Sequence, residues 1–361
     1  MSKLGRVTEE LFALQDAIRS TGMRARSDNG VSIPRQIVEM VRLRLGSGKL
    51  TAEDYYRMRV YRKDLDLAQK REFISQGAVH LLEGWVMIAH DKLIAQALLE
   101  LEGVPTASIR AVCHPLRSYG SRPVLRTREA VLSYLDRDVY PFVAKPVTGI
   151  FSQDVSVVES IDKAAGVLNL AESCTLPIRA FADQCVAQRG GTFFQEVLYP
   201  HPAIVEHVSP RLCTLRLIVL LEKDDVRLFR ALWKIAAHGN VADNYWRPGN
   251  LIARLDLQTG CIEECVTGLG PDCRTVETSP ATGLPLRGFT VPFYAEAVDV
   301  VRRAARAFVG IKMQAWDVAV TPDGPVALEV NEVGSVFLPQ VADGRGMNDE
   351  EFRAYVARVR N

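Results

Sequence analysis

The chain has 361 residues, of which 48% are hydrophobic, and this size suggests two or three compact units rather than one. Its 44 Lys and Arg residues nearly balance its 43 Asp and Glu residues, so the formal charge of +1 implies no nucleic-acid or membrane partner. Since no apolar run is long enough for a membrane helix and the N-terminal residues lack the apolar core of a signal peptide, we expect a cytoplasmic protein.

The N-terminal part, residues 1–88, is predicted to be an all-helical module. Apolar residues recur at helical spacing over residues 8–20, 34–45 and 51–82. Pro34 is expected to open the second helix, and Thr51, followed by two acidic residues, is expected to cap the third. The many Arg and Lys residues of this module favour the solvated faces of amphipathic helices over a surface for nucleic acid.

After residue 92 the pattern changes to alternating helices and strands. Residues 91–103 predict a helix ended by Gly103, and residues 291–309 predict a second helix between strands. The remaining apolar and β-branched runs predict strands, most of them antiparallel. These strands are expected at residues 104–112, 140–147, 192–198, 214–222, 226–237, 251–260 and 313–333.

Three oxygen-bearing side chains lie close together near the end of the chain. Asp317 is expected on one strand of a hairpin and Glu329 and Asn331 on its partner, where alternation places residues 329 and 331 on one face. Two carboxylates and an amide oxygen suit Mg²⁺ bound to nucleotide phosphates. An ordinary surface hairpin with polar residues facing water is the alternative.

A second segment favours the metal–nucleotide interpretation. Lys145 is expected at the end of an apolar strand and is followed by a polar loop that contains Gly149. A buried lysine is costly without an anionic partner, and a phosphate oxygen would supply one.

In the order of these motifs the chain resembles the ATP-grasp superfamily. Asp91-Lys92-Leu93, before a helix and Gly103, is similar to the start of the first ATP-grasp lobe, and Lys145-Pro146 is similar to the second nucleotide lysine. The resemblance implies an α+β ATP-grasp fold with Mg²⁺ and ATP bound between two lobes. It also implies that Asp317, Glu329 and Asn331 are the metal ligands and that residues Gln195, Glu196, Val197 and Leu198 form the hinge that binds adenine.

Three further residues receive roles from the same resemblance. Arg216 and Lys234, on expected strands, would contact the transferred phosphate and an acyl phosphate or substrate carboxylate. Asn244 would lie on the phosphate or substrate side. Charges facing outward at the edge of a sheet are the alternative for Arg216 and Lys234.

Within the superfamily the chain most resembles the sugar-transfer-associated ATP-grasp proteins. The resemblance rests on the helical segment over residues 51–75 and on residues 243–260. It implies a helical module at 1–88, a first lobe at 89–192 and a second lobe at 193–361, with helices in place of a Rossmann-like N-terminal lobe. Ala315 stands where D-alanyl-D-alanine-type ligases have an arginine, which puts their substrate in doubt.

The implied activity is an ATP-dependent carboxylate–amine ligase that acts through an acyl phosphate, in polysaccharide or natural-product biosynthesis. Its partners would be a small-molecule carboxylate and an amine. A kinase that phosphorylates a small-molecule or sugar acceptor, and a non-catalytic ATP-binding scaffold, are the alternatives. A homodimer through the helical module is compatible with the sequence, although no heptad pattern supports a coiled coil.

Overall fold

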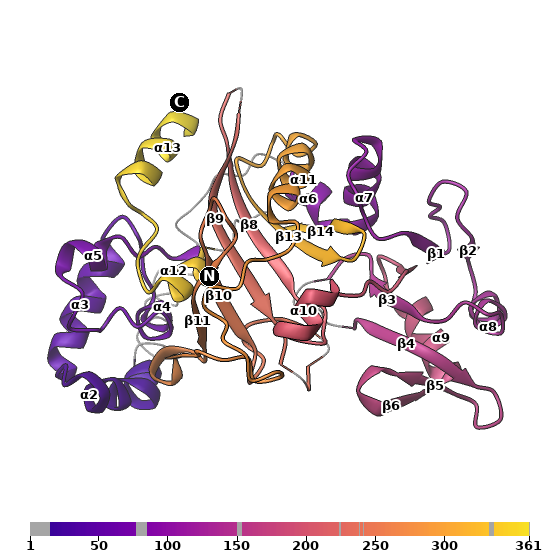
Figure 1. Cartoon of the computed structure of the whole chain (residues 1–361), viewed down its shortest axis with the longest axis horizontal. Helices are drawn as coiled ribbons and strands as arrows, with labels where there is room; N and C mark the ends of the chain where they lie inside the picture. Colours follow the sequence, from indigo (N-terminus) through magenta and orange to yellow (C-terminus); the bar gives the residue numbers. More distant parts are fainter. Residues whose placement is uncertain are drawn as a thin grey trace, which may run out of the picture.

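Two seven-stranded sheets, with helices packed on them, make up the described part of the computed structural model (Figure 1). This α+β arrangement places the first sheet on the right of the view, the second in the middle and the helices of residues 23–71 on the left. The structure describes residues 15–76, 85–149, 154–223, 225–237, 239–240, 242–331 and 336–360.

The first sheet has the strand order β2-β1-β7-β3-β4-β5-β6. Helices α8 and α9 cover one face, where Phe142, Phe181 and Phe194 pack together in the core. The elements are β1 (Ile109–Cys113), β2 (Val124–Leu125), α8 (Arg128–Leu135), β3 (Phe142–Pro146), β4 (Ser156–Asp162), β5 (Val167–Leu170), β6 (Cys174–Pro177), α9 (Ile178–Ala187) and β7 (Thr192–Gln195).

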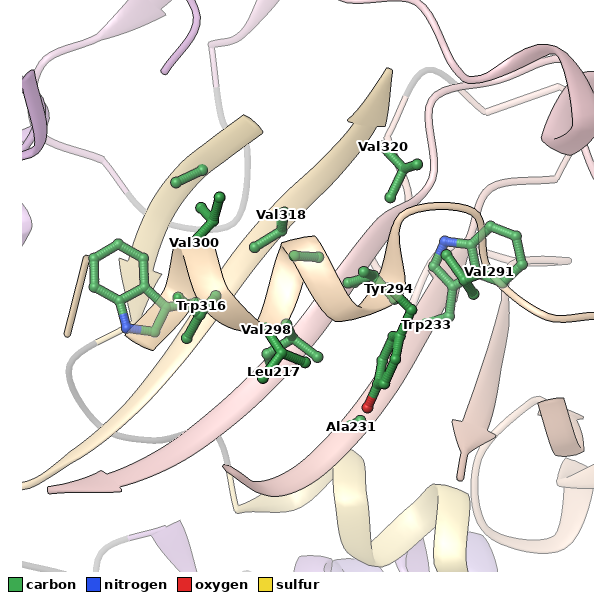
Figure 2. Close-up of a cluster of buried hydrophobic side chains, with 14 of the residues drawn as sticks. Leu217, Ala231, Trp233, Val291, Tyr294, Val298, Val300, Trp316, Val318 and Val320 are labelled. Atoms are coloured by element: carbon green, nitrogen blue, oxygen red, sulfur yellow. The ribbon is translucent and has the colours of Figure 1, made fainter. Parts of the chain in front are cut away.

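The second sheet has the order β12-β11-β10-β9-β8-β13-β14. Figure 2 shows α11 lying across one face, with Tyr294 and Val298 toward Trp233, Leu217 and Trp316 of the strands. The elements are α10 (Pro202–His207), β8 (Thr214–Leu221), β9 (Val226–Ile235), β10 (Leu251–Leu255), β11 (Ile262–Thr267), β12 (Arg274–Thr275), α11 (Tyr294–Arg306), β13 (Met313–Thr321) and β14 (Gly324–Asn331).

The expected hairpin near the end of the chain is confirmed. β13 and β14 pair antiparallel from Thr321 opposite Gly324 to Ala315 opposite Asn331. Gly324 closes the turn with φ of 119°, a backbone conformation that glycine adopts readily and that residues with a Cβ atom disfavour. This register places Asp317 directly opposite Glu329.

The N-terminal region is helical, but its third expected run is not a single helix. The Thr51 cap is confirmed, because its hydroxyl and the Asp54 carboxylate each accept the other residue's backbone N–H. The helix then ends, since Arg59 has φ of 56°, and Asp66 caps a new one. Parts of the first and third runs, residues 8–14 and 77–82, lie outside the described residues. The elements are η1 (Ile18–Gly22), α2 (Met23–Asn29), α3 (Ile33–Leu45), α4 (Ala52–Arg57), α5 (Leu67–Arg71), α6 (Val86–His90) and α7 (Lys92–Leu101).

These helices share a hydrophobic core with the second sheet. Buried Tyr55 and Tyr61 belong to the same cluster as Leu232 on β9 and Ile252 on β10. The C-terminal helix α12 (Phe337–Asp343) packs into this cluster, whereas α13 (Glu350–Arg360) packs near β8 and β9. The described helices of the N-terminal region therefore share their core with the second sheet.

Helix α7 joins the two sheets. Ala95 and Leu99 pack in the core of the second sheet, whereas Leu93 packs with the first. After the helix, the Pro105 carbonyl accepts the N–H of Ala327 on β14 at 2.9 Å. Among the described residues, no helix is long and apolar enough to cross a membrane.

Candidate functional site

A row of charged residues crosses three neighbouring strands of the second sheet. Arg216 on β8 lies opposite Asp317 on β13, and Asp317 lies opposite Glu329 on β14. Cross-strand partners point to the same face, so these three side chains, here called the charged row, share one face of the sheet. A bulge after Asp317 interrupts the β13–β14 register beside the row, and such bulges re-aim side chains.

Asp317 is held by two cations. Its Oδ1 accepts Arg216 Nε at 2.5 Å, and its Oδ2 accepts Arg216 Nη2 at 3.0 Å and Lys234 Nζ at 3.1 Å. All three side chains are more than nine-tenths buried. Burial raises the pKa of Asp317, but the two cations outweigh it and lower that pKa to about 2. The carboxylate is therefore ionised, and the group has the character of a buried salt-bridge network.

Asp243 extends this network, and the sequence analysis missed it. Its Oδ1 accepts Lys234 Nζ at 3.2 Å, and its Oδ2 accepts both the N–H of Thr214 at 2.9 Å and its hydroxyl at 2.5 Å. Burial lowers the pKa of Lys234, but Asp243 and Asp317 raise it above its usual value. The position beside Asn244 in a polar loop was the one sequence signal that could have indicated Asp243.

Glu329 and Asn331, on β14, carry the other two oxygen-bearing side chains of the expected metal site. Within the described residues, the half-buried Glu329 carboxylate has no hydrogen bond or ion pair. The amide nitrogen of Asn331 donates to the Ala315 carbonyl at 3.3 Å, which leaves its amide oxygen for a cation. Asp317 accepts three hydrogen bonds where a carboxylate can accept about four. No cluster of three or more His, Cys, Asp or Glu occurs among the described residues, so Asn331 is needed for a third ligand.

Lys145 lies on β3 of the first sheet and has no carboxylate bonded to it among the described residues. Its Nζ donates to the side-chain oxygen of Gln195 at 2.9 Å. Gln195 is itself fixed, because its amide nitrogen donates to Gln96 and to the Ala107 carbonyl. Burial lowers the pKa of Lys145, nearby Glu329 opposes this change and nearby Lys92 adds to it. Lys145, Glu329 and Lys92 are therefore neighbours across the two sheets.

Lys92 is the first residue of α7, and Asp91 caps this helix by accepting the N–H groups of Leu93 and Ile94. The Lys92 ammonium donates to the Gly149 carbonyl at 2.8 Å. This contact ties Lys92 to the segment after Lys145, whose expected polar loop continues through residues 150–153, outside the described residues.

The expected adenine hinge follows β7. Glu196 pairs with Ser108, since its N–H donates to the Ser108 carbonyl at 3.0 Å and its carboxylate accepts the Ser108 N–H at 2.6 Å. Val197 and Leu198 are half-buried, and their backbone groups form no hydrogen bond within the described part of the chain. They therefore have the free N–H and C=O groups that a planar base requires.

Asn244 follows Asp243 in the loop between β9 and β10. Its side-chain oxygen is buried and, within the described residues, has no hydrogen-bond partner. A buried acceptor without a donor is costly, so this atom is suited to a ligand N–H or O–H. Asn250, by contrast, is fully buried and bonded to the backbone of the loop.

The site has lysines on one α+β unit and two carboxylates and an amide on the next. This is the arrangement of an ATP-grasp protein. ATP-grasp proteins are a class of ATP-dependent enzymes that includes many carbon–nitrogen ligases. The model of the sugar-transfer-associated ATP-grasp family matches residues 83–354, and the chain belongs to that family.

Several solved structures are similar to this chain. An N5-carboxyaminoimidazole synthase from Aspergillus clavatus, in complex with ADP and 5-aminoimidazole ribonucleotide, is 13% identical with a TM-score of 0.41, over 75% of this chain and 58% of that one. A D-alanyl-alanine synthetase A from Vibrio cholerae is 9% identical with a TM-score of 0.41, over 76% and 66%. An L-amino acid ligase from Bacillus licheniformis is 15% identical with a TM-score of 0.35, over 68% and 41%.

The matched region thus spans less than two thirds of each of these three chains. No curated protein matches the sequence.

Proposed function

We propose that this chain is an ATP-dependent ligase that activates a carboxylate as an acyl phosphate for attack by an amine. The observation that carries the proposal is the juxtaposition of Lys145 and Glu329 across the two sheets. Within the described residues, neither has an oppositely charged group bonded to it. A nucleotide phosphate would pair with the lysine, and its metal ion would pair with the carboxylate.

Each residue then has a distinct role in binding. Lys92 and Lys145 hold phosphate oxygens, and the backbone of Val197 and Leu198 bonds the adenine edge, with Gln195 and Glu196 fixing the strand before them. Asp317, Glu329 and Asn331 would hold Mg²⁺, which neutralises charge on the phosphates when bound.

Transfer of the γ-phosphoryl group mainly requires that the reacting groups are positioned and that their negative charge is neutralised. A carboxylate oxygen of the substrate forms a bond to the γ-phosphorus as the bond to ADP breaks. The amine then attacks the carbonyl carbon, inorganic phosphate leaves and the amine loses a proton. Arg216 and Lys234 would stabilise the oxyanion of this second step, and Asn244 would contact the phosphate or the substrate.

The charged row limits how Arg216 and Lys234 can act. Both cations contact Asp317 in the ligand-free chain, so their remaining donors must serve the substrate, or one must exchange partners when ligands bind. An arginine has five N–H donors and a lysine three, so each keeps donors beyond those used here. The proposal therefore gives Asp317 two roles, as a ligand of Mg²⁺ and as the partner that holds Arg216 and Lys234 in place.

The finer parts of the proposal come from the sequence. The carboxylate and the amine would be small molecules used in polysaccharide or natural-product biosynthesis in the cytoplasm, and the domain limits of 88 and 192 would separate helical module, first lobe and second lobe. The second limit falls at the first residue of β7, which belongs to the first sheet, so a lobe limit after Gln195 fits the strands better.

The test begins with ATP binding, measured by calorimetry and thermal shift with and without Mg²⁺. Lys145→Ala and Glu329→Ala should each abolish Mg²⁺-dependent stabilisation by ATP, whereas Lys163→Ala on the exposed β4–β5 turn should retain it. If no nucleotide stabilises the wild-type chain, the ATP-dependent assignment is wrong and a scaffold role replaces it.

Product analysis follows for a chain that binds ATP. An amide formed together with ADP and inorganic phosphate would support the ligase. A stable phosphorylated product would instead support a kinase, and binding without any ADP formation over a broad panel of acceptors would support the scaffold.

A further inference from the structure

A small cavity lies between the N-terminal helices and the second sheet, on the sheet face that carries the charged row. It has a volume of about 110 Å³. Arg57, Arg59 and Arg62 line it from the helical region, and Glu264 of β11 and Asp343 of α12 line it from the other side. Three arginines of the helical region therefore line one partly open cavity.

Two buried arginine nitrogens without a hydrogen bond lie at this cavity or beside it. Among the described residues, seven buried side-chain nitrogen or oxygen atoms have no hydrogen-bond partner, and Arg62 Nε and Arg254 Nε are two of them. Both lie near carboxylates, since Arg62 Nε is 3.5 Å from Asp64 and the Arg254 guanidinium is 3.6 Å from Glu264 and 3.9 Å from Asp343. Both atoms can donate a hydrogen bond, so the ligand they suit is rich in acceptors.

Arg59 has fewer interactions with other side chains than the other two arginines of the lining. Within the described residues it forms no ion pair, and its guanidinium lies near the hydroxyl of Tyr61, where it opposes the rise in pKa that burial causes. Its φ of 56° is a strained conformation for arginine, and residues in such conformations occur often at ligand sites. Arg57 and Arg62 are more constrained. Arg57 donates to the Glu53 carboxylate at 2.7 Å and lies over the Phe337 ring, whereas Arg62 lies 3.5 Å from Asp64 and donates to the Gly344 carbonyl.

The two carboxylates of the lining lie beside arginines other than Arg59. Glu264 is paired with Arg254, and Asp343 lies 3.6 Å from Arg230. Arg57 and Arg62 have exposed carboxylate partners, Glu53 and Asp64. Arg59 is therefore the lining arginine that has no ion pair within the described residues.

We propose that this cavity binds a small anion, namely the phosphate or carboxylate group of a small molecule. A guanidinium fork matches the oxygens of both groups. The site is separate from the nucleotide site, because Leu232 on β9 stands between Arg254 on β10 and Arg216 on β8. Two strand spacings put these arginines about 10 Å apart in the sheet. The inference does not rest on the proposed ligase activity.

Thermal unfolding of the whole chain tests the proposal, with inorganic phosphate and acetate as separate probes and potassium chloride added to keep ionic strength constant. At ten times its dissociation constant, a bound anion should raise the melting temperature by about 2 °C. Arg59→Asn should abolish the rise, since asparagine tolerates the left-handed backbone but lacks the guanidinium. Arg26→Gln, on the exposed side of α2, is the matched control and should keep it.

Lys145→Ala separates this site from the nucleotide site. Stabilisation by phosphate that survives in Lys145→Ala and disappears in Arg59→Asn, while ATP shows the reverse pattern, supports the cavity. A response to phosphate alone identifies a phosphate group as the ligand, and an equal response to acetate identifies a carboxylate. If phosphate and acetate stabilise the wild type and Arg59→Asn equally, or not at all, water fills the cavity and the proposal is wrong.

Discussion

The two sheets hold their lysines in opposite ways. Lys234 on the second sheet contacts two aspartates, and its pKa is raised. Lys145 on the first sheet contacts only the amide of Gln195, and burial lowers its pKa. The second sheet therefore pairs its lysine with carboxylates, whereas Lys145 of the first sheet has no bonded carboxylate among the described residues. Under the function proposed above, a phosphate of the ligand would pair with Lys145.

The largest effect expected from this contrast is the loss of stability in Asp317→Asn. Removing one partner of a buried ion-pair network costs about 3–5 kcal/mol, because Arg216 loses its carboxylate and Lys234 loses one of two. Urea unfolding should show this decrease in the free energy of unfolding. Asp323→Asn, in the exposed turn of the same hairpin, should change it by less than about 0.5 kcal/mol.

The pH dependence provides a further check on Asp317. Its folded-state pKa of about 2 lies below the ordinary 3.8, so its contribution to stability is full above pH 4 and is lost as the pH falls toward 2. The difference in stability between wild type and Asp317→Asn should shrink over this range. A difference that stays constant down to pH 2 would show that the ion pairs are not its source.

An intermediate effect is expected for Asp243→Asn. The variant keeps the shape of the side chain but removes the charge that holds Lys234, and the cost should be about 1–3 kcal/mol. Lys234 would then depend on Asp317 alone, so Mg²⁺ should bind the ADP complex more weakly in this variant. Calorimetry with Mg²⁺ and ADP measures that affinity.

Lys234→Met provides the control for this coupling. Without the lysine, Asp243→Asn should no longer weaken Mg²⁺ binding. An equal loss of Mg²⁺ affinity with and without Lys234 would mean that Asp243 acts on the loop and not through the lysine.

The smallest effect concerns the pH dependence of ATP binding through Lys145. Its pKa lies below the ordinary 10.5, and a bound phosphate would raise it. Affinity should be constant below the pKa of the free chain and fall by up to about tenfold per pH unit above it, because binding then requires uptake of a proton. Titrations from pH 7 to 10 should show an earlier decline for wild type than for Lys145→Arg, which stays charged. Identical profiles would contradict a role for Lys145 in phosphate binding.

Local patterns were enough to predict the hairpin and the helix starts. Alternation along two strands placed Glu329 and Asn331 on one face, and a turn at Gly324 set Asp317 opposite Glu329. The cap at Thr51 followed from residue types alone. In each case the relevant atoms lie within about fifteen residues of one another in the chain, where hydrogen bonding and side-chain direction are set by local geometry.

Contacts between distant segments could not be predicted in this way. The partners of Lys234 come from β13 and from the loop after β9, and Asp243 carries no signal apart from its polar neighbours. The helical periodicity over residues 51–82 hid a break at Arg59, because buried Tyr61 and Leu65 keep an apolar spacing without a helix. The packing of the N-terminal helices on β9 and β10 likewise depends on tertiary structure.

The hydrogen bond from Ala327 to Pro105 has a mechanical consequence. It attaches the chain just after α7 to the strand that carries Glu329, and Thr106 bridges the same residue. Helix α7 spans the two sheets, because Ala95 and Leu99 are buried against the second sheet and Leu93 against the first. Lys92, at the start of this helix, is bonded to Gly149 after β3, so the attachment holds Lys92 close to both Lys145 and Glu329 before any ligand is bound.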